Sequence, residues 1–278
     1  MDSATPKGLR DIEGSLLYLA AAAEEPETSG LHEPPPDDAG WPGRSCRYTV
    51  PIRDARLMIK ELSLDREGFV LLRNQTAVTN FYDEHEVRAV YYPEVERLIK
   101  DATGAAKVVV FAHDVRSILK ARAGEKGVRE PVAPVHNDYT IKSGPEHLHE
   151  LVDSDEAETR LKHRFVEINV WRPIRGPVQS TPLAVCDSRS IAQMDLVPID
   201  LKHEVYMVRF SPSHRWFYFP DMETNEVLLI KGFDSMEDGR ARFTPHAAFE
   251  DLTAPASAPA RESIEARALV LYGPELNA

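Results

Sequence analysis

The stretch HEVYMVRFSPSHRWFYFPDMETNEVLLIKGF (203–233) holds three short runs that are rich in β-branched and aromatic residues. These runs are HEVYMVRFS (203–211), HRWFYFP (214–220) and EVLLIKGF (226–233), and they are separated by turn-forming Pro, Ser and Asn. Residues of these types are enriched in strands, and strands joined by such short connections are typical of antiparallel sheets. The stretch therefore predicts a β sandwich or jelly roll.

The same pattern extends to both sides of this stretch, from Ala106 onward. Further strands are expected in KVVVFAHDV (107–115), VEINVWRPI (166–174), PLAVCDS (182–188), ARFTPHAAF (241–249) and ESIEARALVLY (262–272). The Ala/Pro-rich piece LTAPASAPA (252–260) is too short for a domain linker, so we interpret it as a loop between two strands. We expect residues 106–278 to form one β core.

The first third of the chain has a different pattern. Residues 1–23 end in SLLYLAAAAEE, which indicates a short helix, and residues 54–100 are mostly helical in pattern, with Thr103-Gly104 as the helix end. Residues 24–44 are rich in Pro, Gly and acidic residues and are expected to be a loop that wraps the surface. Helices before a run of strands favour a mainly β fold with flanking helices, of the α+β class.

This arrangement predicts a single domain over all 278 residues. Its expected parts are N-terminal helices and a wrapping loop in residues 1–105, and the β core described above.

Composition excludes several classes of function. The chain has 33 Lys and Arg against 45 Asp and Glu, a net charge of −12, which argues against binding to nucleic acid or to an anionic membrane. No apolar run is long enough to span a bilayer, and the first residues lack a secretory signal. Two cysteines cannot build a disulfide framework. We therefore expect a cytoplasmic protein.

The triplet His136-Asn137-Asp138 is a candidate for metal binding. A His and a carboxylate two residues apart on a strand point to the same side. With one distal His they form a facial triad that leaves three positions open on Fe(II). The distal candidates are His246 and His214, and we favour His246 because it precedes the last strand with its arginines. Taken alone, the triplet is better explained as a turn in which Asp138 binds nearby backbone.

The final strand carries a charged face made of Arg261, Ser263, Glu265 and Arg267. An Arg with a hydroxyl two residues away can clamp a carboxylate. For Arg267, anion binding and pairing with Glu265 are equally favoured, whereas for Arg261 pairing with Glu265 is the less favoured explanation. The cluster His147-Leu148-His149-Glu150 lacks a third ligand at suitable spacing and is interpreted as a solvated surface run.

Several segments together resemble a known enzyme family. They are IRDAR, LDREGFVL, YYPEVERLIKDATGA, PVHNDYT, NVWRPI, PLAVCDSRS, SPSHRWFYFPDMETNEVLLIKGFDS, FTPHAAFED and RESIEARALVLY. The ordered set resembles Fe(II)/2-oxoglutarate-dependent oxygenases of secondary metabolism, a group that includes fungal hydroxylases and desaturases of the gibberellin-desaturase type and a bacterial protein of cephamycin methoxylation. The resemblance covers nearly the whole chain.

The resemblance implies a double-stranded β-helix (a cupin-like jelly roll), an iron centre and the co-substrate 2-oxoglutarate. His136 and Asp138 match the proximal iron ligands, and Arg261 with Ser263 looks like the pair that holds the distal carboxylate of 2-oxoglutarate. Arg267 is the alternative for that role. The implied reaction uses O2 and releases succinate and CO2 while a small natural-product intermediate is hydroxylated, desaturated or closed into a ring.

Aromatic and amide side chains are candidates for the walls of the substrate pocket. They are Tyr139, Asn169, Trp171, Trp216 and Tyr218.

Two other functions remain open on the sequence. One is a metal-dependent cupin-like enzyme that does not use 2-oxoglutarate, and the other is a β-sandwich binding protein without catalytic activity. The expected partners are a small-molecule substrate and O2, with no nucleic acid and no membrane, and a homodimer is compatible with the sequence.

Overall fold

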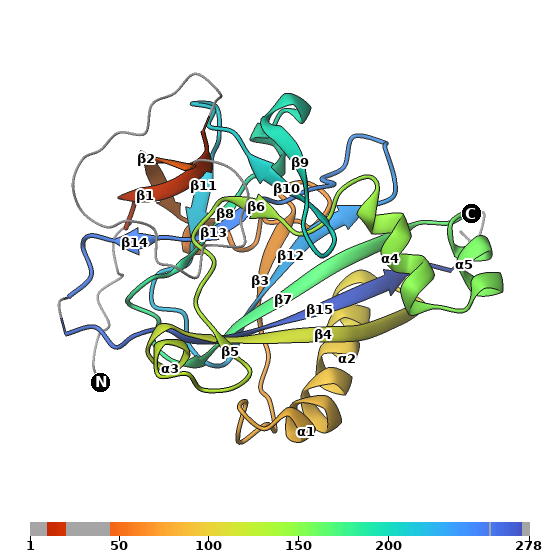
Figure 1. Ribbon diagram of the computed structural model, residues 1–278, viewed down its shortest axis with the longest axis horizontal. Helices are drawn as coiled ribbons and strands as arrows, with labels where there is room; N and C mark the ends of the chain where they lie inside the picture. The colour runs from red at the N-terminus through yellow and green to blue at the C-terminus, as the bar shows by residue number, and fades with distance from the viewer. Residues whose placement is uncertain (1–9, 21–44, 256, 274–278) are drawn as a thin grey trace.

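The computed structural model describes residues 10–20, 45–255 and 257–273, which form two packed sheets with helices outside them (Figure 1). In spatial order, the nine-stranded sheet contains β14 (Glu250–Asp251), β1 (Ile12–Leu19), β2 (Ser45–Asp54), β11 (Trp216–Tyr218), β8 (Leu183–Cys186), β13 (His246–Ala248), β6 (His136–Asn137), β10 (Glu204–Val208) and β9 (Leu196–Asp200). The six-stranded sheet contains β3 (Phe69–Arg73), β12 (Glu226–Asp234), β7 (Phe165–Arg175), β15 (Glu262–Leu271), β4 (Lys107–Ser117) and β5 (Val128–Arg129).

Most neighbouring strands run antiparallel, as in the pairs β7–β15 and β8–β13, whereas β2–β11 and β4–β5 are parallel. One apolar cluster draws side chains from both sheets, with Leu16 and Tyr18 from the larger sheet and Phe165 and Leu269 from the smaller. Two mostly antiparallel sheets around a shared core make the jelly roll that was expected.

The helices lie at the edges and on the outer face of the six-stranded sheet. They are α1 (Glu84–Glu86), α2 (Tyr92–Thr103), α3 (Ile118–Arg122), α4 (Ser143–Leu151) and α5 (Ser154–Arg160), with a π-helical turn at Val87–Tyr91 between α1 and α2 and 3₁₀ turns at Ala55–Met58, Ser188–Ser190 and Gln193–Asp195. No helix in these described parts of the chain has the length and apolar character needed to cross a membrane.

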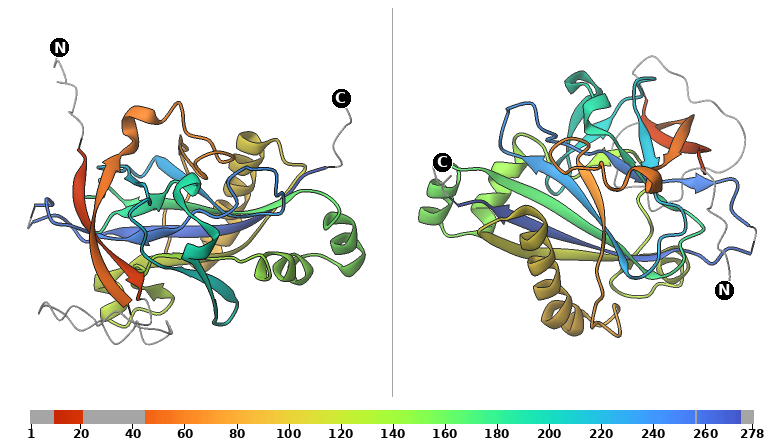
Figure 2. Two further views of the ribbon diagram at one scale, coloured as in Figure 1. Left: turned by 90° about the horizontal axis from the view of Figure 1, so that it is seen from above. Right: turned by 180° about the vertical axis from the view of Figure 1, so that it is seen from behind.

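Helix α2 covers the outer face of the six-stranded sheet, and the right-hand view of Figure 2 shows it in front of the strands. Val95 and Ile99, four residues apart, are buried against strand residues such as Val108. The helix ends where Gly104 adopts a left-handed conformation (φ 70°) and donates its N–H to the carbonyl of Lys100, as the Thr103-Gly104 pair predicts.

Strand β7 is buried along nine consecutive residues, from Phe165 to Pro173. It lies between β12 and β15, with α2 over one face and the larger sheet over the other. A strand covered on both faces needs no polar alternation except where its side chains meet a site. Its two inward polar residues, Glu167 and Asn169, are fully buried.

The structure corrects two expectations for the first third of the chain. Of the predicted helix in residues 1–23, the described part is strand β1, which pairs with β2 from Ile12↔Ile52 to Leu19↔Ser45. In the region 54–100, residues 69–73 form β3, and regular helix begins only at Glu84. In both places, pairing within a sheet outweighs local helix propensity. The expected wrapping loop at 24–44 lies outside the described residues.

Candidate metal centre

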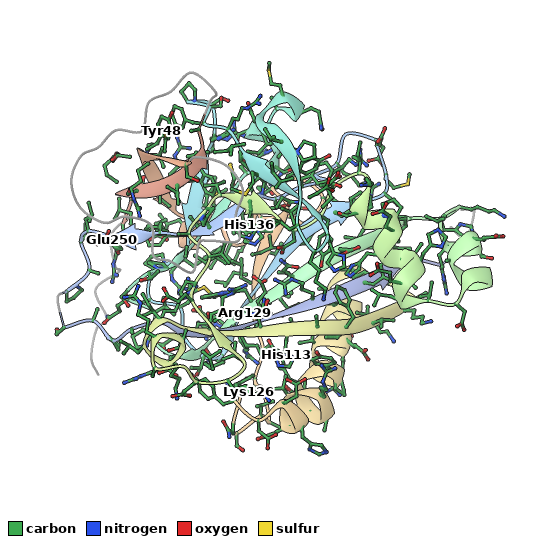
Figure 3. The ribbon with its side chains drawn as sticks, in the orientation of Figure 1. Tyr48, His113, Lys126, Arg129, His136 and Glu250 are labelled. Carbon is green, nitrogen blue, oxygen red and sulfur yellow. The ribbon has the colours of Figure 1, made fainter. Side chains whose placement is uncertain are left out.

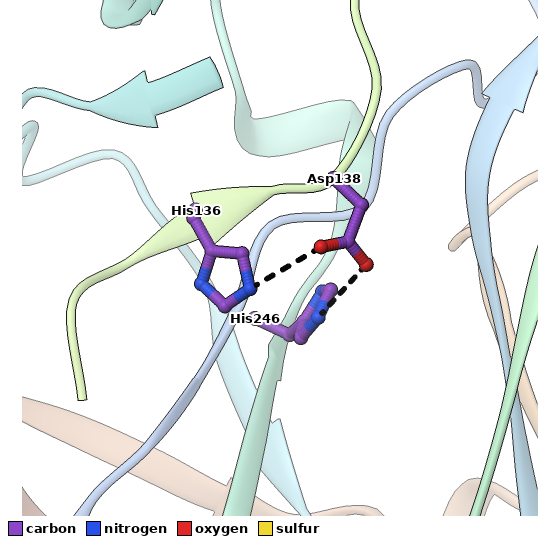
Figure 4. A group of neighbouring side chains, drawn as sticks. All are labelled: His136, Asp138 and His246. Atoms are coloured by element: carbon purple, nitrogen blue, oxygen red, sulfur yellow. Dashed lines mark ion pairs between the residues drawn. The ribbon is translucent and has the colours of Figure 1, made fainter. Parts of the chain in front are cut away.

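Strand pairing brings His136, Asp138 and His246 together (Figure 4). His136 opens β6, Asp138 follows that strand, and His246 opens β13 directly opposite His136 in the sheet register. The Nε2 atom of His136 is 3.6 Å from Oδ1 of Asp138, and Nε2 of His246 is 3.9 Å from Oδ2 of the same carboxylate. Two imidazole nitrogens and a carboxylate therefore face one point and could hold a metal ion.

Each imidazole ring is held by a backbone carbonyl close to it in sequence. The Nδ1 atom of His136 lies 2.8 Å from the carbonyl of Pro134, and Nδ1 of His246 lies 3.1 Å from that of Thr244. Because a carbonyl can only accept, Nδ1 is the protonated nitrogen in both rings. The lone pair is left on Nε2, the atom that faces Asp138, as a metal ligand requires.

Asn137 ties together the backbone segments that carry these ligands. Its Nδ2 donates to the carbonyls of Tyr139 and Gly232, at 2.7 and 2.8 Å, and its Oδ1 accepts the N–H of Thr244 at 3.0 Å. The side chain is fully buried. It therefore fixes the loop after β6 relative to the residues that precede His246.

The carboxylate of Asp138 has two further neighbours. Asn169, on β7, donates a short hydrogen bond from Nδ2 to Oδ2, and Nε of Arg267 lies 3.8 Å from the same oxygen. Burial alone would raise the pKa of Asp138, but Arg267 and the two histidines outweigh it and hold that pKa below its usual range.

Burial shifts the pKa of the neighbouring His136 imidazole in the opposite direction. It lowers the pKa of His136 to about 3, and the nearby His246 adds to this effect. At neutral pH the site thus presents a neutral imidazole beside an ionised carboxylate, the protonation states that metal coordination needs.

Arg261 is a buried cation with no carboxylate bound to it among the described residues. Its Nη1 donates to the carbonyl of Thr181 at 2.7 Å, and the guanidinium lies 5.5 Å from the ring centre of Trp171. Burial, followed by repulsion from Arg116, lowers the pKa of Arg261 to about 9. Its Nε and the buried Oγ of Ser263 find no hydrogen-bond partner in the described chain. These unsatisfied donors fit an anionic ligand.

A cavity of about 20 Å³ connects Arg261 with the histidines. It is lined by Arg116, Val132, His136, Trp171, Leu183, His246, Arg261 and Glu265. Trp171, expected as a pocket wall, lies here.

Arg267 has the partners that Arg261 lacks. Its Nη1 is 2.8 Å from Asp114 and its Nη2 is 2.9 Å from Glu265, in addition to the contact with Asp138. Three carboxylates balance its charge and, although burial opposes them, hold the pKa of Arg267 above its usual range. The two arginines of the last strand therefore differ in whether their charge is already satisfied.

His136 and Asp138 also line a larger pocket of about 760 Å³. Tyr139 and Arg267 line it, together with residues that the sequence analysis did not select, including Phe111, His147 and His203. Figure 3 labels three of the lining residues, His113, Arg129 and His136, which come from β4, β5 and β6.

Three other candidates, Trp216, His214 and Tyr218, do not line this pocket. Trp216 donates its Nε1 to the hydroxyl of Tyr18 at 2.7 Å, within the core, and does not line the pocket. His214 bonds Asp195 at 3.1 Å through Nε2 and Tyr18 at 3.1 Å through Nδ1. Of the two distal histidines considered, the fold brings His246 to the triplet. The hydroxyl of Tyr218 donates to the carbonyl of Arg10.

Sequence reasoning missed Arg116 and Glu167. Both lie on strands near residues that had been selected: Arg116 pairs with Ser263, and Glu167 precedes Asn169 by two residues on the same face of β7. The position of Glu167 on the same strand face as Asn169 could have identified it as a site residue. A charged side chain on an otherwise apolar strand face is costly unless it has a polar partner or lines a binding site.

The chain is similar to proteins of known activity. The family model described as "Oxidoreductase/YMDC permease-like domain" matches residues 16–271. The hydroxylase/desaturase efuI of Hormonema carpetanum is 37% identical over 250 residues, which cover 80% of this chain and 83% of that protein. The Fe(II)/2-oxoglutarate-dependent dioxygenase nvfI of Aspergillus novofumigatus is 33% identical over 81% of this chain and 84% of its own length. A solved structure of the iron and alpha-ketoglutarate-dependent endoperoxidase NvfI superposes with a TM-score of 0.81 at 27% identity, over 95% of this chain and 99% of that one.

Proposed function

Because the chain belongs to the Fe(II)/2-oxoglutarate-dependent oxygenases, we propose that it oxidises a small natural-product intermediate in the 760 Å³ pocket, with His136, Asp138 and His246 as the iron ligands. The observation that carries the ligand assignment is the convergence of these three side chains, with both Nε2 atoms turned toward Asp138. The relatives' names match this activity and neither of the alternatives, a cupin-like enzyme without 2-oxoglutarate or a non-catalytic binding protein.

Bound Fe(II) supplies the redox chemistry that couples O2 reduction to decarboxylation of 2-oxoglutarate into succinate and CO2. The chain's own residues hold and orient the groups involved. The carbonyls of Pro134 and Thr244 keep each ligand imidazole in the required tautomer, and Asn169 fixes the carboxylate of Asp138.

Arg261 and Ser263 are assigned to the distal carboxylate of 2-oxoglutarate. Arg261 is buried without a counter-ion in the described chain, and the Ser263 hydroxyl beside it is unsatisfied. Arg267 is assigned a positioning role instead, because Asp114, Glu265 and Asp138 already surround its guanidinium. A carboxylate at Arg261 would gain a charge-assisted pair that the same anion could gain at Arg267 only by displacing another carboxylate.

The pocket has a volume usual for small-molecule sites. Its wall combines aromatic surface, from Tyr139 and Phe111, with imidazoles and charged groups, from residues such as His147 and Arg129. We infer a substrate with an apolar skeleton and a few polar substituents. A cytoplasmic location and a homodimer remain predictions.

An anaerobic titration tests the proposal. Fe(II) and 2-oxoglutarate together should produce a weak visible absorption band, which His136→Ala should abolish. His149→Ala, an exposed position on α4, is the matched histidine control and should keep the band. In air, succinate should form. A full-intensity band in His136→Ala, or no succinate from the wild type, would contradict the proposal.

A further inference from the structure

We propose that His147, Glu150 and His203 form a second divalent-metal site in the wall of the same pocket. His147 and Glu150 lie three residues apart on α4 and so share one side of the helix. His203 comes from the turn between β9 and β10, which lies beside α4 in Figure 1. The ligand atoms of the three residues all lie within 4.8 Å of one another. The third ligand that local spacing lacks is thus supplied by a distant part of the chain.

The geometry turns one nitrogen of His147 toward this cluster. Its Nε2 is 4.0 Å from Oε2 of Glu150, and the rings of His147 and His203 are 5.4 Å apart between centres. Phe111 packs edge-on against the His147 ring at 4.6 Å. The imidazole is therefore held in place by packing.

A buried carboxylate behind His147 sets which nitrogen carries the proton. Oε2 of Glu167, which is fully buried, lies 3.3 Å from Nδ1 of His147. Since a carboxylate accepts, Nδ1 carries the hydrogen and Nε2 keeps its lone pair for the cluster. A carboxylate bound to the far nitrogen of a histidine is the arrangement that orients metal-ligating histidines and raises their basicity. Besides His147, the hydroxyl of Tyr139 also acts on this buried carboxylate.

The donor set indicates the class of ion. Two imidazole nitrogens and one carboxylate suit Zn²⁺ or another borderline cation, whereas Ca²⁺ and Mg²⁺ prefer oxygen ligands alone. Three protein ligands leave at least one position open, and the cluster lines the same pocket as His136. A cation held there would offer that position to an oxygen of a molecule in the pocket.

Equilibrium dialysis of the whole chain against Zn²⁺ tests the proposal. The wild type should bind two equivalents, and His203→Ala or Glu150→Ala should bind one. Both side chains are exposed, so their removal leaves the core intact, which circular dichroism would verify. His149→Ala removes an exposed histidine from the same helix and should still bind two equivalents.

Three further variants separate this site from the iron centre. His136→Ala should bind one equivalent, and combining it with His203→Ala should bind none. Glu167→Gln should weaken the second equivalent about tenfold or more while leaving the first. If the wild type binds a single equivalent that His136→Ala removes, or if His203→Ala still binds two, the second site is refuted while the iron centre stands.

Discussion

Replacing Arg261 by Met should abolish tight binding of 2-oxoglutarate. It should not lower the stability of the protein in the absence of 2-oxoglutarate. Removing one partner of a buried, hydrogen-bonded charge pair costs about 2–5 kcal/mol. At 1.4 kcal/mol for each factor of ten, the dissociation constant of 2-oxoglutarate should rise about 30-fold to a few thousand-fold. The affinity for the metal should change little, since the guanidinium of Arg261 bonds the carbonyl of Thr181 and none of the three candidate metal ligands.

The stability of the ligand-free variant follows from the environment of the same side chain. Burial without a counter-ion lowers the pKa of Arg261 from 12.5 to about 9, equivalent to about 5 kcal/mol against the charged form. Against this, the hydrogen bond to Thr181 contributes about 1.5–3 kcal/mol and the contact with Trp171 about 0.5–2 kcal/mol. We therefore expect Arg261→Met to be unchanged in ligand-free stability, or up to about 3 kcal/mol more stable.

The assay is thermal and urea unfolding with and without 2-oxoglutarate, under anaerobic conditions with Mn²⁺ in place of Fe(II). At 100 times its dissociation constant, 2-oxoglutarate should stabilise the wild type by about 2.7 kcal/mol and the variant hardly at all. Arg267→Met is the control, and it should lose about 3–5 kcal/mol even without ligand because it removes the ion-pair partner of the buried Glu265. A ligand-free Arg261→Met that is more than about 2 kcal/mol less stable, or a dissociation constant within threefold of the wild type, would refute the reasoning.

Three further predictions test single contacts. Asn169→Ala should lower Fe(II) or Mn²⁺ affinity about 10–100-fold, measured by anaerobic titration, because it frees the carboxylate of Asp138; an unchanged affinity would show that the contact does not orient the ligand. Lys231→Met should cost about 1–3 kcal/mol in urea unfolding, because it removes a buried cation 2.7 Å from the fully buried Asp234, which keeps its pair with Arg164; an unchanged stability would contradict this. Arg189 and Arg215 outweigh the effect of burial and hold the pKa of Asp187 below 3.8. The ionised carboxylate therefore contributes fully to the stability of the fold above pH 3.8, and this contribution is lost as the pH falls through the folded-state pKa. Asp187→Asn should therefore cost about 1–3 kcal/mol at pH 7, and the difference from wild type should shrink below about pH 4, whereas an equal difference at both pH values would argue against the charge pairing.

The β core could be predicted because its strands have strong local patterns. EVLLIKGF and ESIEARALVLY became β12 and β15 with nearly the expected bounds. Strand β1 could not be predicted, because SLLYL also fits a helix and only pairing with β2 selects the extended form. Local sequence does not contain that pairing.

The candidate site was also predictable only where it depends on local sequence. The spacing of His136 and Asp138 is local and visible in sequence, while the choice of His246 over His214 depended on the arginines expected after it. Arg261 could not be preferred over Arg267 from the residues alone. The difference lies in Asp114, which β4 brings beside β15 and which pairs with Arg267 but not with Arg261.

The position of β15 in its sheet has a consequence for how the chain folds. This strand, residues 262–271, lies between β7 and β4 in the sheet. The edges of β7 and β4 that face it therefore have no pairing strand until residues 262–271 have been synthesised. During synthesis these edges of β4 and β7 would remain unpaired, and an unpaired strand edge can form hydrogen bonds with another chain instead. Sheet formation should therefore be a late, slow and largely all-or-none event, as pairing between distant segments generally is. A chain that stops before residue 262 should aggregate rather than yield a smaller folded core.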